Sequence, residues 1–149
     1  MTTIAVNKDM IAGDKQFTYH GEVKMKGVTK IYELPVITAN ILFECDKVFI
    51  GFAGGSSAFS SAIEWIYDPT GQPPRLKNIE FLALTERHQI FLTDNLAHWH
   101  RIGDPYFSIG SGSEFALGAM AAGKTPYEAV KIASKYDVST GMGFNKLEL

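Results

Sequence analysis

The N-terminal stretch constrains the fold of this chain more than any other part, because it predicts two short strands joined by a tight turn. Thr2–Val6 is rich in β-branched residues and has no helical period. Asn7–Asp9 has the residue types of a turn, and Met10–Tyr19 then predicts a second strand. Asp14 lies in that strand among apolar residues, where a carboxylate is usually either paired or exposed.

The remaining elements follow from hydrophobic period and from turn residues. We expect a helix over 59–66, where apolar residues recur at helical spacing, and a buried helix over 115–122, which is apolar nearly all round. A further helix begins after Thr125 and ends near Asp137. Further strands are expected at 30–34, 48–55, 81–85, 90–93, 106–109 and in the tail 139–149. The length of 149 residues predicts one domain spanning 1–149.

Composition excludes several classes of function. Lys and Arg number 14 against 16 Asp and Glu, and no basic stripe appears, so nucleic acid is not an expected partner. The single cysteine, Cys45, excludes an internal disulfide, is consistent with a reducing compartment and is interpreted as a structural thiol. No apolar run is long enough to span a membrane, and the first residues lack a secretion signal, so we expect a cytoplasmic protein with no membrane partner.

The first two residues suggest a nucleophile. Met1 is a candidate for removal because Thr2 has a small side chain. Removal would leave Thr2 with a free α-amine beside its own hydroxyl, the arrangement in which an N-terminal amine activates a threonine. An N-terminus without a function is the alternative, since many proteins begin with the same two residues.

Two other patterns are interpreted as structural. Gly118–Thr125 matches the nucleotide-binding pattern G-x4-G-K-[ST], but that loop needs a strand before it and a helix beginning at its Lys-Ser/Thr. Here a predicted helix precedes it, and Thr125, Pro126 and Glu128 mark a new helix start, so we expect a corner between two helices and no cofactor. His98 and His100 lack a third ligand at suitable spacing, so we interpret their segment as a sheet edge or a loop and predict no metal site.

Several segments together resemble proteasome β-type subunits, and the bacterial HslV-type threonine peptidase most closely. The resemblance covers nearly the whole chain. It is carried by Thr2–Val6, Ile11–Asp14, Lys26–Gly27 with Lys30, Gly51–Gly55, Ile109–Ser113 and Asp137–Gly141.

The resemblance implies an α+β N-terminal nucleophile hydrolase, an αββα sandwich of two antiparallel sheets with a reduced helical layer. Thr2 matches the catalytic threonine, and Asp14 and Lys30 match the carboxylate and lysine beside it. Gly54 matches the glycine whose amide faces the oxyanion. An outer shell that orients the threonine and its amine is implied at Ser111, Asp137 and Thr140.

The resemblance also implies a substrate site and partners. An apolar side-chain pocket aligns with Phe17, Val28, Tyr32, Phe52 and Ser56, and Thr18 aligns with a position that binds substrate backbone. The implied substrate is a peptide or an unfolded protein. The implied partners are further copies of the chain, in a ring or stacked rings, and an AAA+ ATPase unfoldase. Small phage-encoded relatives have a similar compact layout, so the cytoplasm can be that of a bacterium or of a phage host.

The chain departs from the family in two places that bear on assembly. One helix, not two, is expected between Gly55 and Phe81, and the longer stretch from Lys30 to Phe52 predicts an enlarged hairpin around Pro35–Asp46. Two alternative functions therefore stay open. One is a non-catalytic structural or assembly protein that keeps the fold, and the other is an N-terminal nucleophile amidohydrolase that acts on a small amide.

Overall fold

Two antiparallel sheets form the centre of the molecule. The computed structural model describes residues 2–19, 22–25, 27–55, 59–69, 79–93 and 98–149. The four-stranded sheet has the order β10 (Tyr106–Gly110), β1 (Thr3–Asn7), β2 (Met10–Asp14) and β11 (Phe144–Glu148). The five-stranded sheet has the order β5 (Ile31–Glu33), β6 (Val48–Gly54), β7 (Ile79–Thr85), β8 (Ile90–Thr93) and β9 (Trp99–Ile102). A separate hairpin pairs β3 (Phe17–Tyr19) with β4 (Glu22–Met25).

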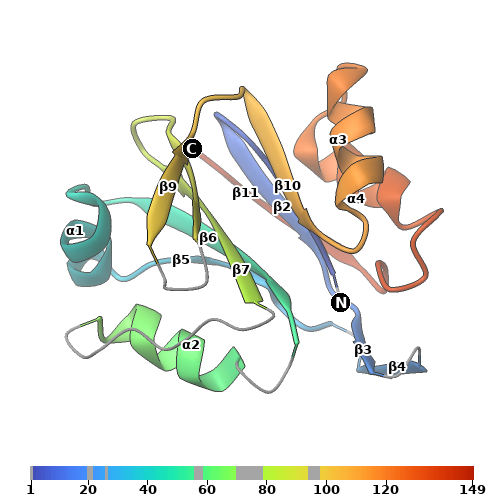
Figure 1. The fold of residues 1–149 in the computed structure, drawn as a ribbon, viewed down its shortest axis with the longest axis horizontal. Helices are drawn as coiled ribbons and strands as arrows, with labels where there is room; N and C mark the ends of the chain where they lie inside the picture. The colour runs from blue at the N-terminus through green and yellow to red at the C-terminus, as the bar shows by residue number, and fades with distance from the viewer. Residues whose placement is uncertain (1, 20–21, 26, 56–58, 70–78, 94–97) are drawn as a thin grey trace.

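Helices cover the outer face of each sheet. α3 (Ser113–Ala121) and α4 (Pro126–Ala133) lie on the four-stranded sheet, and α1 (Val36–Phe43) and α2 (Phe59–Tyr67) lie on the other side of the molecule, as Figure 1 shows. Each sheet therefore buries one face against the other sheet and one face against helices. This arrangement confirms the predicted αββα sandwich.

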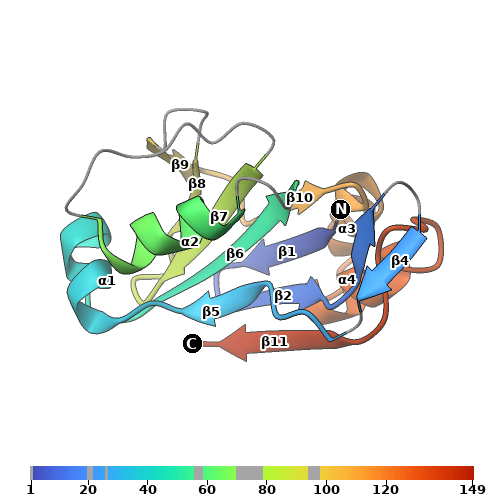
Figure 2. The same cartoon turned by 90° about the horizontal axis from the view of Figure 1, so that it is seen from below.

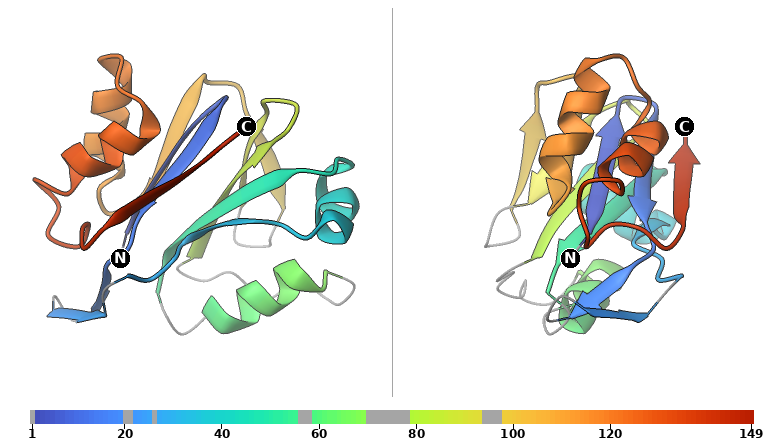
Figure 3. Two further views of the ribbon diagram at one scale, coloured as in Figure 1. Left: turned by 180° about the vertical axis from the view of Figure 1, so that it is seen from behind. Right: turned by 90° about the vertical axis from the view of Figure 1, so that its right-hand side faces the viewer.

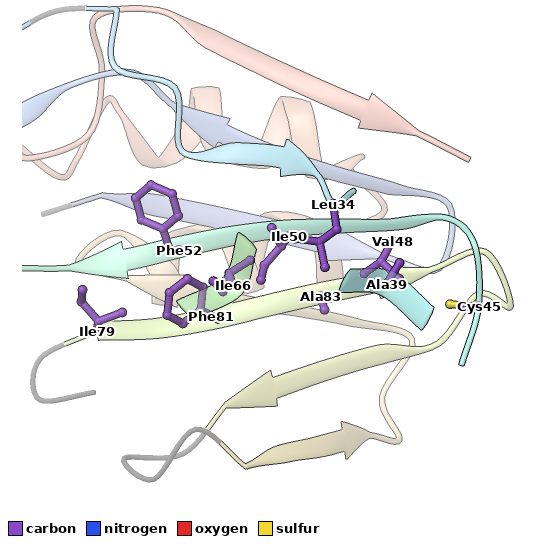
Figure 4. Packing of buried hydrophobic residues seen from close by; sticks show 10 residues of the cluster. All are labelled: Leu34, Ala39, Cys45, Val48, Ile50, Phe52, Ile66, Ile79, Phe81 and Ala83. Atoms are coloured by element: carbon purple, nitrogen blue, oxygen red, sulfur yellow. The ribbon is translucent and has the colours of Figure 1, made fainter. Parts of the chain in front are cut away.

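Three clusters of buried apolar side chains fill the layers. The cluster between the sheets includes Ile4, Ile11 and Leu82, all fully buried. Small residues such as Ala5 and Ala129 let α3 and α4 approach the four-stranded sheet closely. The third cluster packs the five-stranded sheet against α1 and α2, and Figure 4 shows its side chains: Leu34, Ala39, Cys45, Val48, Ile50, Phe52, Ile66, Ile79, Phe81 and Ala83.

The N-terminal hairpin forms as predicted, but its second strand is shorter than expected. Oδ1 of Asn7 accepts hydrogen bonds from the amides of Asp9 and Met10 at 2.9 and 2.8 Å, which closes the turn. β2 then ends at Asp14, because the amide of Lys15 turns away to donate to the carbonyls of Gly141 and Gly143. The predicted strand Met10–Tyr19 is therefore wrong as one element, and β3 begins separately at Phe17.

The enlarged hairpin predicted around Pro35–Asp46 contains a helix that the sequence did not indicate. β5 and β6 do pair antiparallel, as a hairpin requires. The connection between them holds α1, which begins after Pro35 and ends at Glu44 in the left-handed conformation. Thr38 and Ala39 are buried on one side of α1, while Val36, Ile37 and Ile41 are exposed.

The corner between α3 and α4 confirms the structural interpretation of the nucleotide-like pattern. Gly118 lies within α3, and Gly123 turns the chain at φ 91°. The Thr125 hydroxyl accepts from the amide of Glu128, and the Glu128 carboxylate accepts from the amide of Thr125, a complete capping box at the start of α4. α4 ends at Ala133 and not near Asp137, since tighter turns carry the chain on to Asp137.

No helix in the described part of the chain is long and apolar enough to cross a membrane. The helix expected at 59–66 is α2, and residues 70–78 of the same stretch lie outside the described residues. β9 forms the edge of the five-stranded sheet and carries Trp99 and His100. This position agrees with the sheet-edge interpretation of that segment.

Candidate active site

Strand register places Thr2 at a meeting point of both sheets. Thr2 immediately precedes β1, the strand between β10 and β2. In this register Thr3 pairs with Gly110 and Ile4 pairs with Gly13, so Asp14 comes to lie beside Thr2 and Thr3. Figures 2 and 3 show that this end of β1 also lies next to β3 and to the segment that follows α4. Thr2 is 3% exposed.

Asp14 is fully buried and accepts hydrogen bonds on both carboxylate oxygens. Oδ1 accepts from the Thr2 hydroxyl, from the amide of Thr3 at 3.0 Å and from Nζ of Lys30 at 3.0 Å. Oδ2 accepts from the amides of Gln16 and Gly141 at 3.2 and 3.1 Å. Five donors therefore satisfy a charge that would be costly to bury alone.

Lys30 is 5% exposed and lies just before β5. Its ammonium has three acceptors, which are Oγ of Thr2, Oδ1 of Asp14 and the carbonyl of Gln16. Burial lowers the pKa of Lys30 below its ordinary value, although the charge and hydrogen bond of Asp14 oppose this change. The nucleophile candidate therefore contacts both members of a buried ion pair.

Asp137 organises a second group of hydrogen bonds behind Thr2. Its Oδ2 accepts from the hydroxyls of Ser111 and Thr140, each at 2.6 Å, and its Oδ1 accepts from the amide of Ser139 at 3.2 Å. Burial raises the pKa of Asp137, but these hydrogen bonds outweigh it and hold the pKa below the ordinary value. The Ser111 hydroxyl also lies 3.4 Å from the carbonyl oxygen of Thr2.

Sequence reasoning missed two residues of this network. The Thr3 hydroxyl lies 2.6 Å from that of Thr140 and links β1 to the Asp137 group. Gln16 contacts Asp14, Lys30 and the carbonyl of Val138. Neither residue type has a spacing that distinguishes it from an ordinary polar residue in a strand or turn, so no signal in the sequence would have identified them.

Two glycines of the Ile109–Ser113 segment allow its backbone to lie very close to Thr2 and Thr3. Gly110 has φ 96°, and a Cβ built on it would lie 1.9 Å from the carbonyl oxygen of Thr2. A Cβ on Gly112 would lie 2.1 Å from Oγ of Thr3. Only glycine allows β10 and the start of α3 to pack against the residues around the nucleophile.

A cavity of about 780 Å³ opens beside Thr2. Gly54, at φ 146°, lies on its wall together with Ser111. The cavity continues between the two sheets along apolar side chains, which include Ile79, Leu92 and Phe107. The structure thus brings the predicted oxyanion glycine to the same space as Thr2.

The predicted substrate pocket is only partly assembled in the described residues. The rings of Tyr32 and Phe52 stack with centroids 6.0 Å apart, and the Tyr32 hydroxyl donates to the carbonyl of Thr29 at 2.7 Å. Phe17, Thr18 and Val28 are half-buried, and Ser56 lies outside the described residues. The described lining of the cavity beside Thr2 holds none of these residues.

No group of three or more His, Cys, Asp or Glu side chains that could hold a metal ion occurs among the residues that the structure describes. Cys45 is buried, and burial raises the pKa of its thiol.

Comparison with solved structures shows which known proteins share this fold. No family model and no curated protein matches the sequence. Among solved structures, eukaryotic HslV from Trypanosoma brucei has a TM-score of 0.73 at 20% identity, and the match covers 99% of both chains. Thiobacillus denitrificans BPH has a TM-score of 0.67 at 16% identity, over 99% of this chain and 96% of that one. The same protein in complex with epoxomicin has a TM-score of 0.69 at 17% identity, over 99% of this chain and 97% of that one. The predicted resemblance to HslV is thus confirmed at the level of the fold.

Proposed function

We propose that residues 1–149 act as a single HslV-like domain that hydrolyses peptide bonds, with Oγ of Thr2 as the nucleophile. The observation that carries the proposal is the position of the Thr2 hydroxyl, which contacts both Asp14 and Lys30 at the start of β1. The fold shared with HslV supports it, as does the likeness to a protein whose structure was solved with epoxomicin.

The first step requires a free α-amine on Thr2, so the proposal includes removal of Met1. Oγ of Thr2 then attacks the carbonyl carbon of the substrate, and the α-amine accepts the hydroxyl proton. The positive charge of Lys30 disfavours a second charge on that amine and stabilises the developing alkoxide. Asp14 holds Lys30 in place through the 3.0 Å contact between Oδ1 and Nζ.

The second step breaks the C–N bond. The tetrahedral oxyanion is stabilised by the amide of Gly54, which lies on the wall of the same cavity as Thr2. The leaving amine takes the proton from the α-amine and departs, which leaves an ester on Oγ of Thr2. A water molecule then hydrolyses the ester, releases the acid and restores the hydroxyl.

The substrate and partners belong to the same proposal. The cavity reaches Thr2 between the ends of two sheets, which gives access to an extended peptide or an unfolded protein. Exposed apolar side chains on α1, on α3 and in the segment 136–142 support self-association: Val36, Ile37, Ile41, Phe115, Tyr136, Val138 and Met142. We propose a homo-oligomer, in a ring or stacked rings, served by an AAA+ ATPase in the cytoplasm of a bacterium or of a phage host.

Peptide hydrolysis by three proteins tests the proposed function. The parent chain and Thr2→Ser keep a hydroxyl at position 2, whereas Thr2→Ala removes it. We expect cleavage of an unstructured protein by the first two and none by Thr2→Ala, with all three folded by circular dichroism. Cleavage by Thr2→Ala at the parent rate would exclude Thr2 as the nucleophile. Cleavage of small amides alone would favour an amidohydrolase.

A further inference from the structure

Gln16 is a buried polar residue at the active site that the proposed reaction does not use. It is 3% exposed and lies in the short link between β2 and β3, two residues after Asp14. Its surroundings are the two hydrogen-bonded groups described above, the Asp14–Lys30 pair on one side and the turn that follows Asp137 on the other.

The side chain of Gln16 bonds to two separate segments. Nε2 donates to the carbonyl of Val138 at 2.8 Å and to the hydroxyl of Thr18 at 2.9 Å, so both amide hydrogens are used. Val138 directly follows Asp137, the residue that binds the Ser111 and Thr140 hydroxyls. A Cβ on Gly141 would lie 3.0 Å from Oε1 of Gln16, so the turn packs closely over this side chain.

The backbone of Gln16 bonds to the ion pair. Its amide donates to Oδ2 of Asp14 at 3.2 Å, and its carbonyl accepts from Nζ of Lys30 at 2.5 Å. One residue thus contacts the carboxylate, the ammonium, the Asp137 turn and β3. Asp14 and β3 are neighbours of Gln16 in the sequence, whereas Lys30 lies 14 positions away and Val138, in the Asp137 turn, lies 122 positions away.

We propose that Gln16 is a positioning residue for Thr2, and this inference rests on the proposed function. Its side-chain amide ties the Val138 carbonyl and the Thr18 hydroxyl to the link that carries the acceptor for Lys30. The Lys30 ammonium is thereby held against Oγ of Thr2, while the Asp137 turn stays in place behind it. A small displacement of such groups reduces the rate of reaction much more than it reduces binding.

Gln16→Met tests this role because it keeps the length of the side chain and removes both donors. The matched control is Gln89→Met, on the turn between β7 and β8. The register of β6 and β7 places that turn at the end opposite Gly54. We expect Gln16→Met to lower kcat on an unstructured substrate about 100-fold, with KM within about threefold of the parent value. Gln89→Met should leave both constants unchanged.

A purely structural role predicts a different result. The loss of activity in Gln16→Met would then match the unfolded fraction measured by thermal denaturation, and the folded fraction would have the parent kcat. Gln16→Glu gives a second check, because it keeps Oε1 but turns a carboxylate oxygen toward the Val138 carbonyl. We expect its kcat to be as low as that of Gln16→Met. Parent-like kcat in both variants would overturn the inference.

A titration separates this inference from the proposed function. In protein with ¹³C-labelled lysine Cε, the Lys30 signal reports its pKa whether or not the protein cleaves peptides. We expect the pKa of Lys30 to move toward the ordinary value of 10.5 in Gln16→Met, because the loosened link admits water, and to stay unchanged in Gln89→Met. An inactive parent would contradict the proposed function alone. An inactive parent with an unchanged Lys30 pKa in Gln16→Met would overturn both.

Discussion

Nζ of Lys30 lies 3.0 Å from Oδ1 of Asp14, and the two side chains are 6% and 0% exposed. The two partners depend on each other unequally. Asp14 also accepts from the Thr2 hydroxyl and from three backbone amides, whereas the only anionic partner in direct contact with Lys30 among the described residues is Asp14. The buried carboxylate is therefore stabilised by several donors besides Lys30, whereas the Lys30 charge depends on Asp14.

This asymmetry predicts unequal losses of stability. Asp14→Ala leaves a buried lysine without a counter-charge and removes the acceptor for four other donors, so we expect the free energy of unfolding to fall by about 3–5 kcal/mol. Lys30→Met leaves Asp14 with its remaining donors and should cost clearly less. Urea unfolding of both variants at pH 7 measures the difference. Equal losses would contradict this account of the ion pair.

The lowered pKa of Lys30 predicts a pH dependence on the alkaline side. Because the unfolded chain holds the Lys30 proton more tightly than the folded chain, stability should rise with pH between the folded pKa and the ordinary value of 10.5. Lys30→Met has no such proton. The difference in unfolding free energy, parent minus Lys30→Met, should therefore increase as pH rises over this interval, and a decrease would show that the pKa is raised instead.

Asp137 predicts a dependence of the same sign at acid pH. Its pKa is held below the ordinary value of 3.8, so the hydrogen bonds to the carboxylate stabilise the folded chain above that value and are lost as pH falls through the folded pKa. Asp137→Asn should be less stable than the parent at pH 7. Thermal unfolding at several pH values should show this gap closing below about pH 4, and a gap that stayed constant would contradict the assigned pKa.

Gly110 and Gly118 predict effects of opposite sign for the same substitution. Gly110→Ala adds a Cβ 1.9 Å from the Thr2 carbonyl oxygen at a φ of 96°, and we expect a loss of at least about 2 kcal/mol. Gly118 lies inside α3 with nothing within 4 Å of an added Cβ, so Gly118→Ala should stabilise by about 0.5–1 kcal/mol. Unfolding free energies of both variants test this pair. A tolerated Gly110→Ala would contradict the close approach of β10 to Thr2.

Much of the site was predictable, but mainly through the resemblance to a known family, because only Asp14 has an unusual residue type for its position. A carboxylate inside an apolar strand indicated Asp14, and the resemblance then supplied Lys30, Ser111, Asp137 and Thr140. The structure brings the described members of that set together around Thr2. The catalytic roles of these residues stay predictions.

The missed features share one physical reason, which is that they depend on contacts distant in the sequence. α1 is apolar on nearly all sides, so it has no helical period that a sequence pattern could reveal. Its buried side is determined by the contact of Ala39 with the cluster that includes Val48 and Ile50 of β6. The break after Asp14 is set by bonds from Lys15 to Gly141 and Gly143. The role of Gln16 likewise depends on Val138, which lies 122 positions away along the chain.

The most direct measurement of the central claim is the intact mass of the purified protein, before and after treatment with an electrophile that reacts with N-terminal threonines. The account predicts a mass without Met1 and one stoichiometric adduct, which Thr2→Ala abolishes. A retained Met1 with no adduct would contradict it and would favour a non-catalytic assembly protein with the same fold.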